Sequence, residues 1–316
     1  MDRKDVLDLD DFSPDEITQV LDTAEAMREV LSRPIRRVPP LRGKTIVNLF
    51  YEASTRTRIS FELAAKNLSA DVVNVSASGS SVEKGESLVD TIRTLQALGA
   101  DVVVIRHPQA GAPYLVAPHL RGSVVNAGDG CHAHPTQALL DLFTIRRKFG
   151  RINGLTVVIV GDILYSRVAR SNVWGLARMG ARVILCGPPT LMPDFGVNGH
   201  RAGLPPVEVC YDLDRCVKRA DVVMALRIQR ERQSGGLLPS LREYVKLYQV
   251  NAERVGQARP GALVMHPGPM NEGIEIAPDV ARGSHSVIEE QVTNGVATRM
   301  ALLYLLAGER SGLAVA

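Results

Sequence analysis

The stretch YEASTRTRISFE (residues 51–62) joins the end of an apolar run to the beginning of a helical pattern. The run TIVNLFY (45–51) has the composition of a buried strand, and RTRISFELAAKNL (56–68) follows with helical spacing. The apolar residues that the spacing predicts on one face of this helix are Ile59, Leu63 and Ala64. A strand that leads directly into a helix is typical of an α/β fold.

The polar segment from Ser54 to Thr57 falls at the predicted N-terminus of that helix. Unpaired backbone N–H groups and the helix dipole favour an anion at such a position. Hydroxyl groups from Ser54, Thr55 and Thr57, together with the planar fork of Arg56, suit a phosphate. Spacing alone leaves open an ordinary capped helix with solvated arginines.

Short apolar runs alternate with amphipathic stretches along most of the chain. Continuous apolar strands between helices predict parallel sheets that are buried on both faces. The predicted strands form two groups, at 45–51, 71–77, 101–106 and 123–128, and then at 156–162, 182–187, 207–211, 221–227 and 262–266. The fold class is therefore α/β, with two domains that each contain a mostly parallel sheet flanked by helices.

Three helices organise these domains. Ser13, Pro14 and Glu16 predict a capping box at the start of the first helix. A long helix at 134–150 separates the two groups of strands, and another occupies 286–308. We expect one domain at 1–149 and a second at 150–286, with the C-terminal helix (about 287–316) packing back on the first.

Composition excludes several classes of protein. The 316 residues carry a formal net charge of +3 and only 4% aromatic residues, so a stacking platform for nucleic-acid bases is not expected. No apolar run is long enough to span a bilayer, and the charged start MDRKDVLDLDDF lacks a signal peptide, so we expect a cytoplasmic protein. Four cysteines without C-x-x-C spacing predict neither a disulfide framework nor a zinc knuckle.

Further motifs connect the opening stretch with a known family. FYEASTRTRISFE closely resembles the carbamoyl-phosphate signature of the aspartate and ornithine carbamoyltransferases. Other segments resemble the aspartate branch in the family's order, and the resemblance covers nearly the whole chain: SSVEKGESLVDTI (80–92), IRHPQAGAPYL (105–115), NAGDGCHAHPTQALLDLF (126–143), VGDILYSRVARSN (160–172), LRIQRER (226–232) and MHPGPMNEGIEI (265–276).

The resemblance implies a role for each matching residue. The residues expected to bind carbamoyl phosphate are Ser54, Thr55, Arg56, Thr57, Arg106, His134, Gln137, Gly268 and Pro269. Those expected to bind aspartate are Lys84, Arg167, Arg227 and Gln229, with Ser80 and Lys84 supplied by a neighbouring subunit. The resemblance gives the catalytic roles to Arg56, Thr57, Lys84, Arg106 and His134.

The implied reaction explains these residue types. The amine of aspartate attacks the carbamoyl carbon, phosphate leaves, and negative charge develops on the carbonyl oxygen, to which Thr57, Arg106 and His134 can donate. The reaction is an early step of pyrimidine synthesis, and it requires no metal, cofactor or enzyme nucleophile. The family also implies a homotrimer with shared active sites. Whether regulatory chains or a dihydroorotase partner bind to it is a question that the sequence leaves open.

Other interpretations are weaker. CHAH (131–134) has too few ligands at sound spacing for zinc, and the segment around Lys84 lacks the order of a phosphate-binding P-loop. VVIVGDILYSR lacks the G-x-G-x-x-G of a dinucleotide fold. In isolation, His134 reads as a helix cap, and Arg167 as a solvated helix residue. A non-enzymatic homologue that binds carbamoyl phosphate or a partner enzyme is disfavoured by the intact set of residues.

The choice between the two branches depends on the amine site. The ornithine branch is expected to carry a Cys in an H-C-L-P motif, whereas this chain has HPGP (266–269) and arginines that suit a dicarboxylate. Tyr165 and Glu272 depart from the expected pattern, because near relatives often have His and Arg there. Both residues flank the predicted aspartate side and bear on aspartate affinity.

Overall fold

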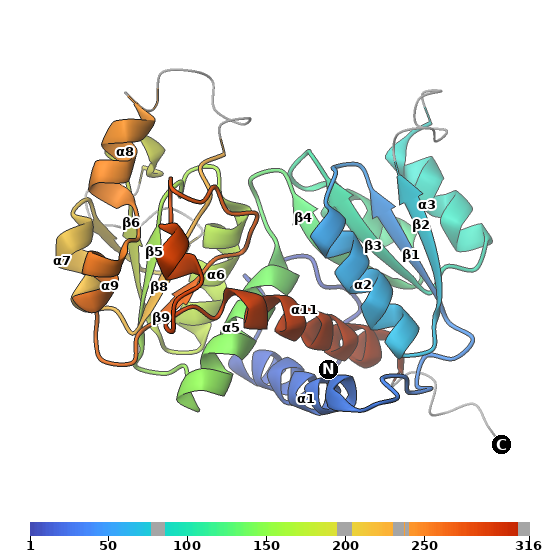
Figure 1. Cartoon of the computed structure of the whole chain (residues 1–316). Helices are drawn as coiled ribbons and strands as arrows, with labels where there is room; N and C mark the ends of the chain where they lie inside the picture. The colour runs from blue at the N-terminus through green and yellow to red at the C-terminus, as the bar shows by residue number, and fades with distance from the viewer. Residues whose placement is uncertain (77–85, 195–203, 230–236, 238–239, 309–316) are drawn as a thin grey trace. The chain divides into compact units, whose positions relative to one another are not determined.

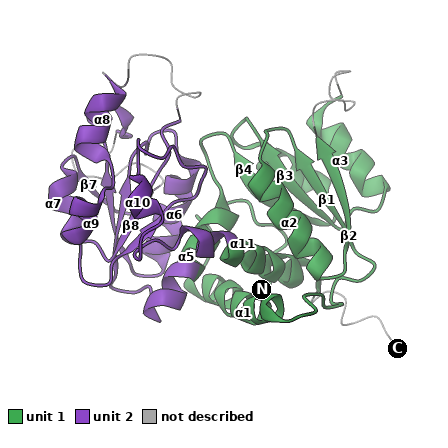
Figure 2. Cartoon of the chain, viewed as in Figure 1, with its two compact units in different colours: residues 1–143, 293–316 green, residues 144–292 purple. Residues whose placement is uncertain are grey.

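The computed structural model describes residues 1–76, 86–194, 204–229, 237 and 240–308, and the chain divides into two compact units (Figures 1 and 2). Unit 1 comprises Met1–Phe143 and Thr293–Ala316, and unit 2 comprises Thr144–Val292. The chain passes from unit 1 to unit 2 within helix α5 (Pro135–Phe149) and returns within α11 (Ile288–Leu303). The divisions fall inside these two helices, whereas the sequence placed them at 149/150 and 286/287.

Unit 1 is built on a four-stranded parallel sheet with strand order β2-β1-β3-β4. Its strands are β1 (Thr45–Phe50), β2 (Asp71–Ser76), β3 (Val102–His107) and β4 (Ser123–Asp129). The three strands β1, β3 and β4 are largely buried, as their continuous apolar runs predict, while the edge strand β2 is mostly exposed. The strands predicted in this group are therefore confirmed.

The first helix of unit 1 begins where its capping residues predict. Helix α1 (Pro14–Ser32) has the predicted capping box, in which Ser13 and Glu16 each accept the other's backbone N–H. The helices that connect the strands are α2 (Thr55–Asn67), α3 (Leu88–Ala97) and α4 (Ala112–Val116), followed by the 3-10 turn η2 (Ala117–His119). Arg28 of α1 donates to Asn294 of α11, and Arg299 of α11 donates to Ser60 of α2, so α11 is bonded to both helices (Figure 1).

Of the three apolar residues that the sequence places on one face of α2, only Ala64 is buried. The buried residues are Thr57, Phe61, Ala64 and Ala65, whereas Ile59 and Leu63 are 46% and 45% exposed. Apolar residues at helical spacing can mark a contact with another molecule as well as a core, and periodicity does not distinguish the two.

Unit 2 contains a five-stranded parallel sheet with strand order β7-β6-β5-β8-β9. Its strands are β5 (Thr156–Val160), β6 (Arg182–Cys186), β7 (Glu208–Cys210), β8 (Val222–Ala225) and β9 (Leu263–Met265). The connecting helices are α6 (Arg167–Arg178), the 3-10 turn η3 (Pro189–Leu191), α7 (Leu213–Val217), α8 (Leu241–Tyr248), α9 (Ala252–Gly256) and α10 (Pro278–Ala281). The predicted strands and the two-sheet α/β fold class are confirmed in the described part of the chain.

The C-terminal helical segment, Ile288–Gly308, follows its predicted span closely. Helix α11 ends at Leu303, and one π-helical turn, η5 (Tyr304–Gly308), completes the segment. In the ranges that the structure describes, no helix combines the length and the apolar character needed to cross a membrane.

The expectation of no disulfide is wrong for one pair of cysteines. Cys210 at the end of β7 and Cys216 in α7 form a disulfide, while Cys131 and Cys186 are thiols. Asp212 caps α7 directly after the strand, so the chain reverses within a few residues and brings the two Cα atoms to 6.7 Å. Sequence spacing does not reveal such a reversal, because it depends on where the short helix begins.

Candidate active site

The predicted phosphate-binding residues of unit 1 gather at the carboxyl edge of its sheet. Ser54–Thr57 follow β1, Arg106 lies near the end of β3, and His134 follows β4. Since β1, β3 and β4 are parallel neighbours, their carboxyl ends share one edge, which is where open α/β sheets bind ligands. The backbone N–H of Tyr51 donates to the carbonyl of Arg106 at 2.8 Å and holds the first two segments together.

The start of α2 has the features of an anion site. Ser54 is the N-cap residue, and its side chain makes no capping hydrogen bond within the described part of the chain. The first turn contains no acidic residue, Thr57 is buried, and Arg56 is exposed. The first N–H groups of the helix therefore belong to a turn that carries hydroxyl groups and a guanidinium but no carboxylate.

Arg106 is held in place by two acceptors. Its guanidinium donates to the carbonyl of Ala127 at 3.2 Å and forms an ion pair with Glu52. Only 11% of its side chain is exposed. Glu52 lies within the quoted motif, but the sequence analysis gave it no role, because a single carboxylate beside an anion site carries no signal of its own.

His134 and Gln137 are positioned at the start of α5. His134 is buried, and its carbonyl accepts the backbone N–H of Gln137 at 3.0 Å. The Gln137 amide donates to buried Asp141 at 3.0 Å, one turn further along the helix. Asp141 was missed by the sequence analysis, although its spacing of four residues from Gln137 is the available signal.

A buried cation on α11 lies in the same region of unit 1. Burial lowers the pKa of Arg299 to about 10, the charge of Asp141 raises it, and the charge of Arg106 lowers it. Its Nη1 donates to Ser60 at 2.8 Å, and its guanidinium lies over the Phe61 ring at 5.0 Å. The sequence analysis missed Arg299, because a single arginine in an apolar helix does not indicate buried contacts with Ser60 and Phe61.

Unit 2 places a second set of predicted residues at the carboxyl edge of its own sheet. Arg167 is the first residue of α6, after β5, and Arg227 and Gln229 follow β8. Fully buried Asp162 connects these loops, since its carboxylate accepts the backbone N–H groups of Tyr165 and Gln229, each at 3.1 Å. Asp162 is another residue that the sequence analysis missed.

Gly268 and Pro269 follow β9, which pairs with β8, and they are joined by a cis peptide bond. His266 supports this turn: its Nδ1 accepts the Gly268 N–H at 2.8 Å, and its Nε2 lies 3.1 Å from the Glu275 carboxylate. The same Glu275 oxygen also accepts the Asn271 N–H at 2.6 Å. The side chains of His266 and Glu275 are 0% and 1% exposed, so this support is fully buried.

The two departures from the expected pattern have different surroundings. The backbone N–H of Tyr165 binds Asp162, as above. Glu272 forms an exposed ion pair with Arg282, with N–O distances of 3.0 and 2.9 Å. The predicted residues Ser80 and Lys84, and the arginines at 230 and 232 that could also have paired with Glu272, lie outside the described residues.

Comparison with known proteins defines the class of protein. The family model for the carbamoyl-phosphate-binding domain of aspartate/ornithine carbamoyltransferases matches residues 4–147, and the model for the Asp/Orn-binding domain matches residues 153–306. The chain therefore belongs to the aspartate/ornithine carbamoyltransferase family, as its motifs predict.

Relatives at high sequence identity belong to the aspartate branch, whereas the similar solved structures include both branches. The chain is 66% identical over 307 residues to the aspartate carbamoyltransferase catalytic subunit of Roseiflexus castenholzii, covering 97% of this chain and 96% of the relative. An aspartate transcarbamoylase structure from Trypanosoma cruzi, in complex with N-(phosphonacetyl)-L-aspartic acid, has a TM-score of 0.86 at 31% identity and 95% coverage of both chains. An ornithine carbamoyltransferase from Pyrococcus furiosus has a TM-score of 0.84 at 31% identity, covering 96% of this chain and 97% of that one.

Proposed function

We propose that this chain transfers the carbamoyl group of carbamoyl phosphate to the amine of L-aspartate, giving N-carbamoyl-L-aspartate and phosphate, an early step of de novo pyrimidine synthesis. The observation that carries the proposal is the 66% identity, over nearly the full length, with an aspartate carbamoyltransferase catalytic subunit. The two sets of candidate residues, each at the carboxyl edge of a parallel sheet, support it.

In this proposal, unit 1 binds carbamoyl phosphate. The start of α2 holds the phosphate through Ser54, Thr55, Arg56 and Thr57, while Arg106, His134 and Gln137 bind the carbamoyl end. Thr57, Arg106 and His134 donate to the carbonyl oxygen as it gains negative charge, and each such donor typically lowers the barrier by about 3 kcal/mol. The buried position of His134 and the two acceptors that hold Arg106 favour this role, because preorganised donors cost little reorganisation during reaction.

Unit 2 supplies the aspartate side of the proposed site. Arg167, Arg227 and Gln229 bind the two carboxylates, and the carbonyls of Gly268 and Pro269 accept from the carbamoyl NH₂. The neighbouring subunit contributes Ser80 and Lys84. The neutral amine attacks the carbamoyl carbon, its N–C bond forms, the C–O bond to phosphate breaks, and the proton that the nitrogen loses leaves with the phosphate. Holding two anions together in this way accounts for most of the remaining rate.

Turnover of the two amines tests the choice of substrate. We expect carbamoylation of L-aspartate and not of L-ornithine, because the proposed arginines favour a dicarboxylate and repel a diamine. A mimic that joins a phosphonate to aspartate should bind far more tightly than either substrate, since it spans both half-sites. Comparable turnover of ornithine would contradict the proposal, and no turnover of either amine would favour a non-enzymatic homologue.

We further propose that the chain is active as a homotrimer with shared sites. Ile59, Leu63 and Val73 are 46%, 45% and 47% exposed on α2 and β2 of unit 1, and exposed apolar side chains in neighbouring elements favour contact with another protein. Arg56→Ala and Lys84→Ala chains should each be nearly inactive alone and should regain activity when mixed and reassembled, because some sites receive both intact halves. No recovery in verified mixed trimers would place Lys84 in the site of its own chain.

The proposal includes a cytoplasmic location, where an acyl phosphate and a free amino acid are both accessible as metabolites. Regulatory chains or a dihydroorotase partner are compatible with the proposed trimer. The native mass of the purified chain, alone and after incubation with cell extract, tests both.

A further inference from the structure

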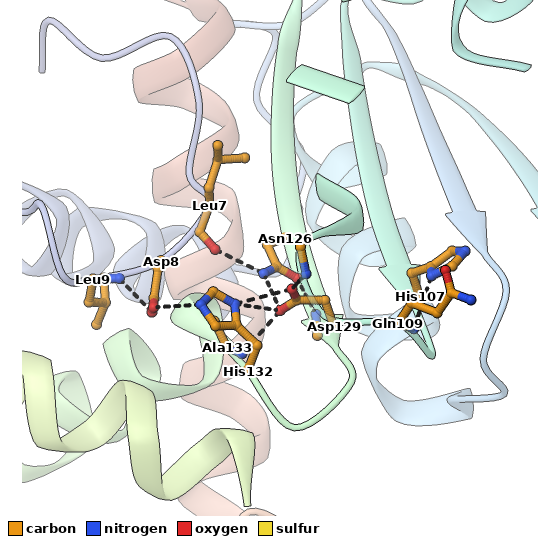
Figure 3. Close-up of polar contacts among 11 residues, drawn as sticks. Leu7, Asp8, Leu9, His107, Gln109, Asn126, Asp129, His132 and Ala133 are labelled. Atoms are coloured by element: carbon orange, nitrogen blue, oxygen red, sulfur yellow. Dashed lines mark hydrogen bonds and ion pairs between the residues drawn. The ribbon is translucent and has the colours of Figure 1, made fainter. Parts of the chain in front are cut away.

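The turn between β4 and α5 is organised around one buried carboxylate. Asp129 accepts the backbone N–H of Ala133 at 3.0 Å and the Asn126 side-chain amide at 2.8 Å through Oδ1, and the Gly111 N–H at 2.7 Å through Oδ2 (Figure 3). The Asp129 and Ala133 backbones are also paired. This turn leads directly into His134 and the first turn of α5, so its geometry fixes where the proposed carbamoyl-binding residues begin.

His132 lies in the same turn, between two buried carboxylates (Figure 3). Its Nδ1 is 3.1 Å from Asp129 Oδ2, and its Nε2 is 3.8 Å from Asp8 Oδ2. The His132 side chain is 25% exposed, whereas both carboxylates are 0% exposed. Solvent protons can therefore reach the imidazole, although the carboxylates on either side of it are buried.

Asp8 belongs to a segment that is far away in sequence. This N-terminal segment lies beside β4, because the Val6 N–H donates to the Val124 carbonyl at 2.9 Å and the Val6 carbonyl accepts the Asn126 N–H at 2.8 Å. The Asn126 side chain also donates to the Leu7 carbonyl at 2.8 Å. His132 thus completes a connection between residues 6–8 and the turn that precedes α5.

Besides Asp129 and Asp8, an aromatic ring and several charged groups surround this cluster. The Tyr114 ring packs edge-on against the imidazole of His132, with 5.8 Å between the ring centroids. Burial and the charges of nearby aspartates raise the pKa of Tyr114, so it carries no charge near neutral pH. Asp10 and Asp11 are among those aspartates. The nearby cation Arg3 is paired with Asp11 and Glu16, and Lys4 contacts Asp5 and the Ala117 carbonyl.

The protonation state of the His132 imidazole decides whether it attracts one or both of the carboxylates. A neutral imidazole carries one N–H and one lone pair, so it can donate to only one of the two carboxylates and turns a lone pair toward the other. An imidazolium carries an N–H on both nitrogens and a positive charge, so it donates to Asp129 at 3.1 Å and attracts the Asp8 carboxylate, which at 3.8 Å is an ion-pair partner and not a hydrogen-bond acceptor. Burial alone would raise the pKa of Asp129, but hydrogen bonds from His132, Asn126 and the Gly111 N–H hold it below its ordinary value.

We propose that His132 is a positioning residue, and that protonation of its imidazole locks the N-terminal segment to the turn that carries His134. In the locked state, the start of α5 is fixed and presents His134 and Gln137 to carbamoyl phosphate. As pH rises and the imidazole loses its proton, the connection to Asp8 weakens and the turn loosens. The kinetic part of this inference rests on the proposed function, whereas the change in local stability does not.

Hydrogen exchange and kinetics of matched variants test the lock. His132→Gln keeps one amide donor but is neutral at every pH, Asp8→Asn removes the distant charge, and His119→Gln changes a histidine of the same unit outside this cluster. Protection factors of backbone amides in residues 5–9 and 129–138 are measured from about pH 6 to about pH 8.5, the range in which imidazoles titrate. The KM for carbamoyl phosphate and kcat are measured over the same range.

In the wild type and His119→Gln, we expect protection of both segments to fall, and the KM for carbamoyl phosphate to rise, by about 3- to 10-fold as pH increases, a range typical of losing one ion pair. His132→Gln and Asp8→Asn should show the weak protection and the high KM at every pH, with kcat changed less than KM. A wild-type pH profile in both variants would overturn the inference. If neither the wild type nor any variant transfers the carbamoyl group, the proposed function is wrong. The hydrogen-exchange profiles then still test whether protonation of His132 stabilises the two segments.

Discussion

Two histidine–carboxylate pairs support the two turns that present the proposed carbamoyl-binding groups, and they differ in their access to solvent. His132 in unit 1 is 25% exposed and faces two carboxylates. His266 in unit 2 is 0% exposed, donates to the single carboxylate of Glu275, and accepts the Gly268 N–H on its other nitrogen. An imidazole that accepts on one nitrogen and donates from the other is fully satisfied in one tautomer. The unit 2 pair is thus a fully buried support with one carboxylate, whereas the unit 1 pair is open to solvent and has two carboxylates.

The largest effect is expected from breaking the buried pair. Glu275→Ala removes the acceptor of both the His266 side chain and the Asn271 N–H, so one buried and one partly buried donor lose their partner. We expect the free energy of unfolding to fall by about 3 kcal/mol, the range seen when a buried polar partner is removed. The single tryptophan, Trp174 in α6 of unit 2, provides a local fluorescence signal for urea unfolding.

Two further variants separate this effect from a general loss of charge. Glu253→Ala removes an exposed carboxylate from α9 of the same unit and should change stability by less than about 0.5 kcal/mol. Glu275→Gln keeps an acceptor oxygen and should fall between the two. If Glu275→Ala unfolds at the same urea concentration as Glu253→Ala, the buried pair is not the support that its geometry indicates.

The second prediction concerns acid stability in unit 1. Because the folded state holds the pKa of Asp129 below its ordinary value, its carboxylate contributes stability above the unfolded pKa of about 3.9, and this contribution is lost as pH falls through the lower folded pKa. Asp129→Asn should therefore cost about 2 kcal/mol at neutral pH and progressively less in acid. Urea unfolding followed by circular dichroism between about pH 3 and about pH 7 measures the difference. A gap that stays constant down to the lowest pH would contradict this linkage.

The sequence predicted the elements of the fold better than their surfaces. The nine apolar runs correspond to β1–β9, and Ser13 with Glu16 located the first helix, because strand burial and capping are local properties. The exposure of Ile59 and Leu63 was not predictable, since helical spacing indicates an apolar face without saying what covers it. The pairing of Cys210 with Cys216 depends on a chain reversal that spacing does not encode.

In the candidate site, too, some residues were predicted from the sequence and others were not. Motifs located Ser54–Thr57, Arg106, His134 and the HPGP turn, because each is a contiguous string beside a strand end. The residues that hold them, such as Glu52, Asp141 and Asp162, were missed. A carboxylate that binds a backbone N–H or another side chain across the fold has no local pattern, so its role emerges only when the chain is folded.

The smallest effect on stability is expected from the exposed pair in the unit 2 turn, Glu272 with Arg282. Their side chains are 36% and 71% exposed, and ion pairs of this kind contribute about 0–1 kcal/mol. Glu272→Gln should therefore leave the urea midpoint nearly unchanged, in contrast to Glu275→Ala three residues further along the same turn. A large loss of stability in Glu272→Gln would erase the distinction between the buried and the exposed side of this turn.

Glu272 should matter instead for the second substrate. The resemblance to the family leads us to expect a cation at this position, and within about one Debye length, roughly 8 Å at physiological salt, the charge of a carboxylate repels a dianion. We expect Glu272→Arg to lower the KM for aspartate and to leave the KM for carbamoyl phosphate nearly unchanged, with an effect that shrinks at high salt. Arg282→Gln, which removes the partner of Glu272, should raise the KM for aspartate, because the carboxylate is then less neutralised. Steady-state kinetics at low and high salt measure both variants, and an unchanged aspartate KM at low salt would confine Glu272 to its pair with Arg282.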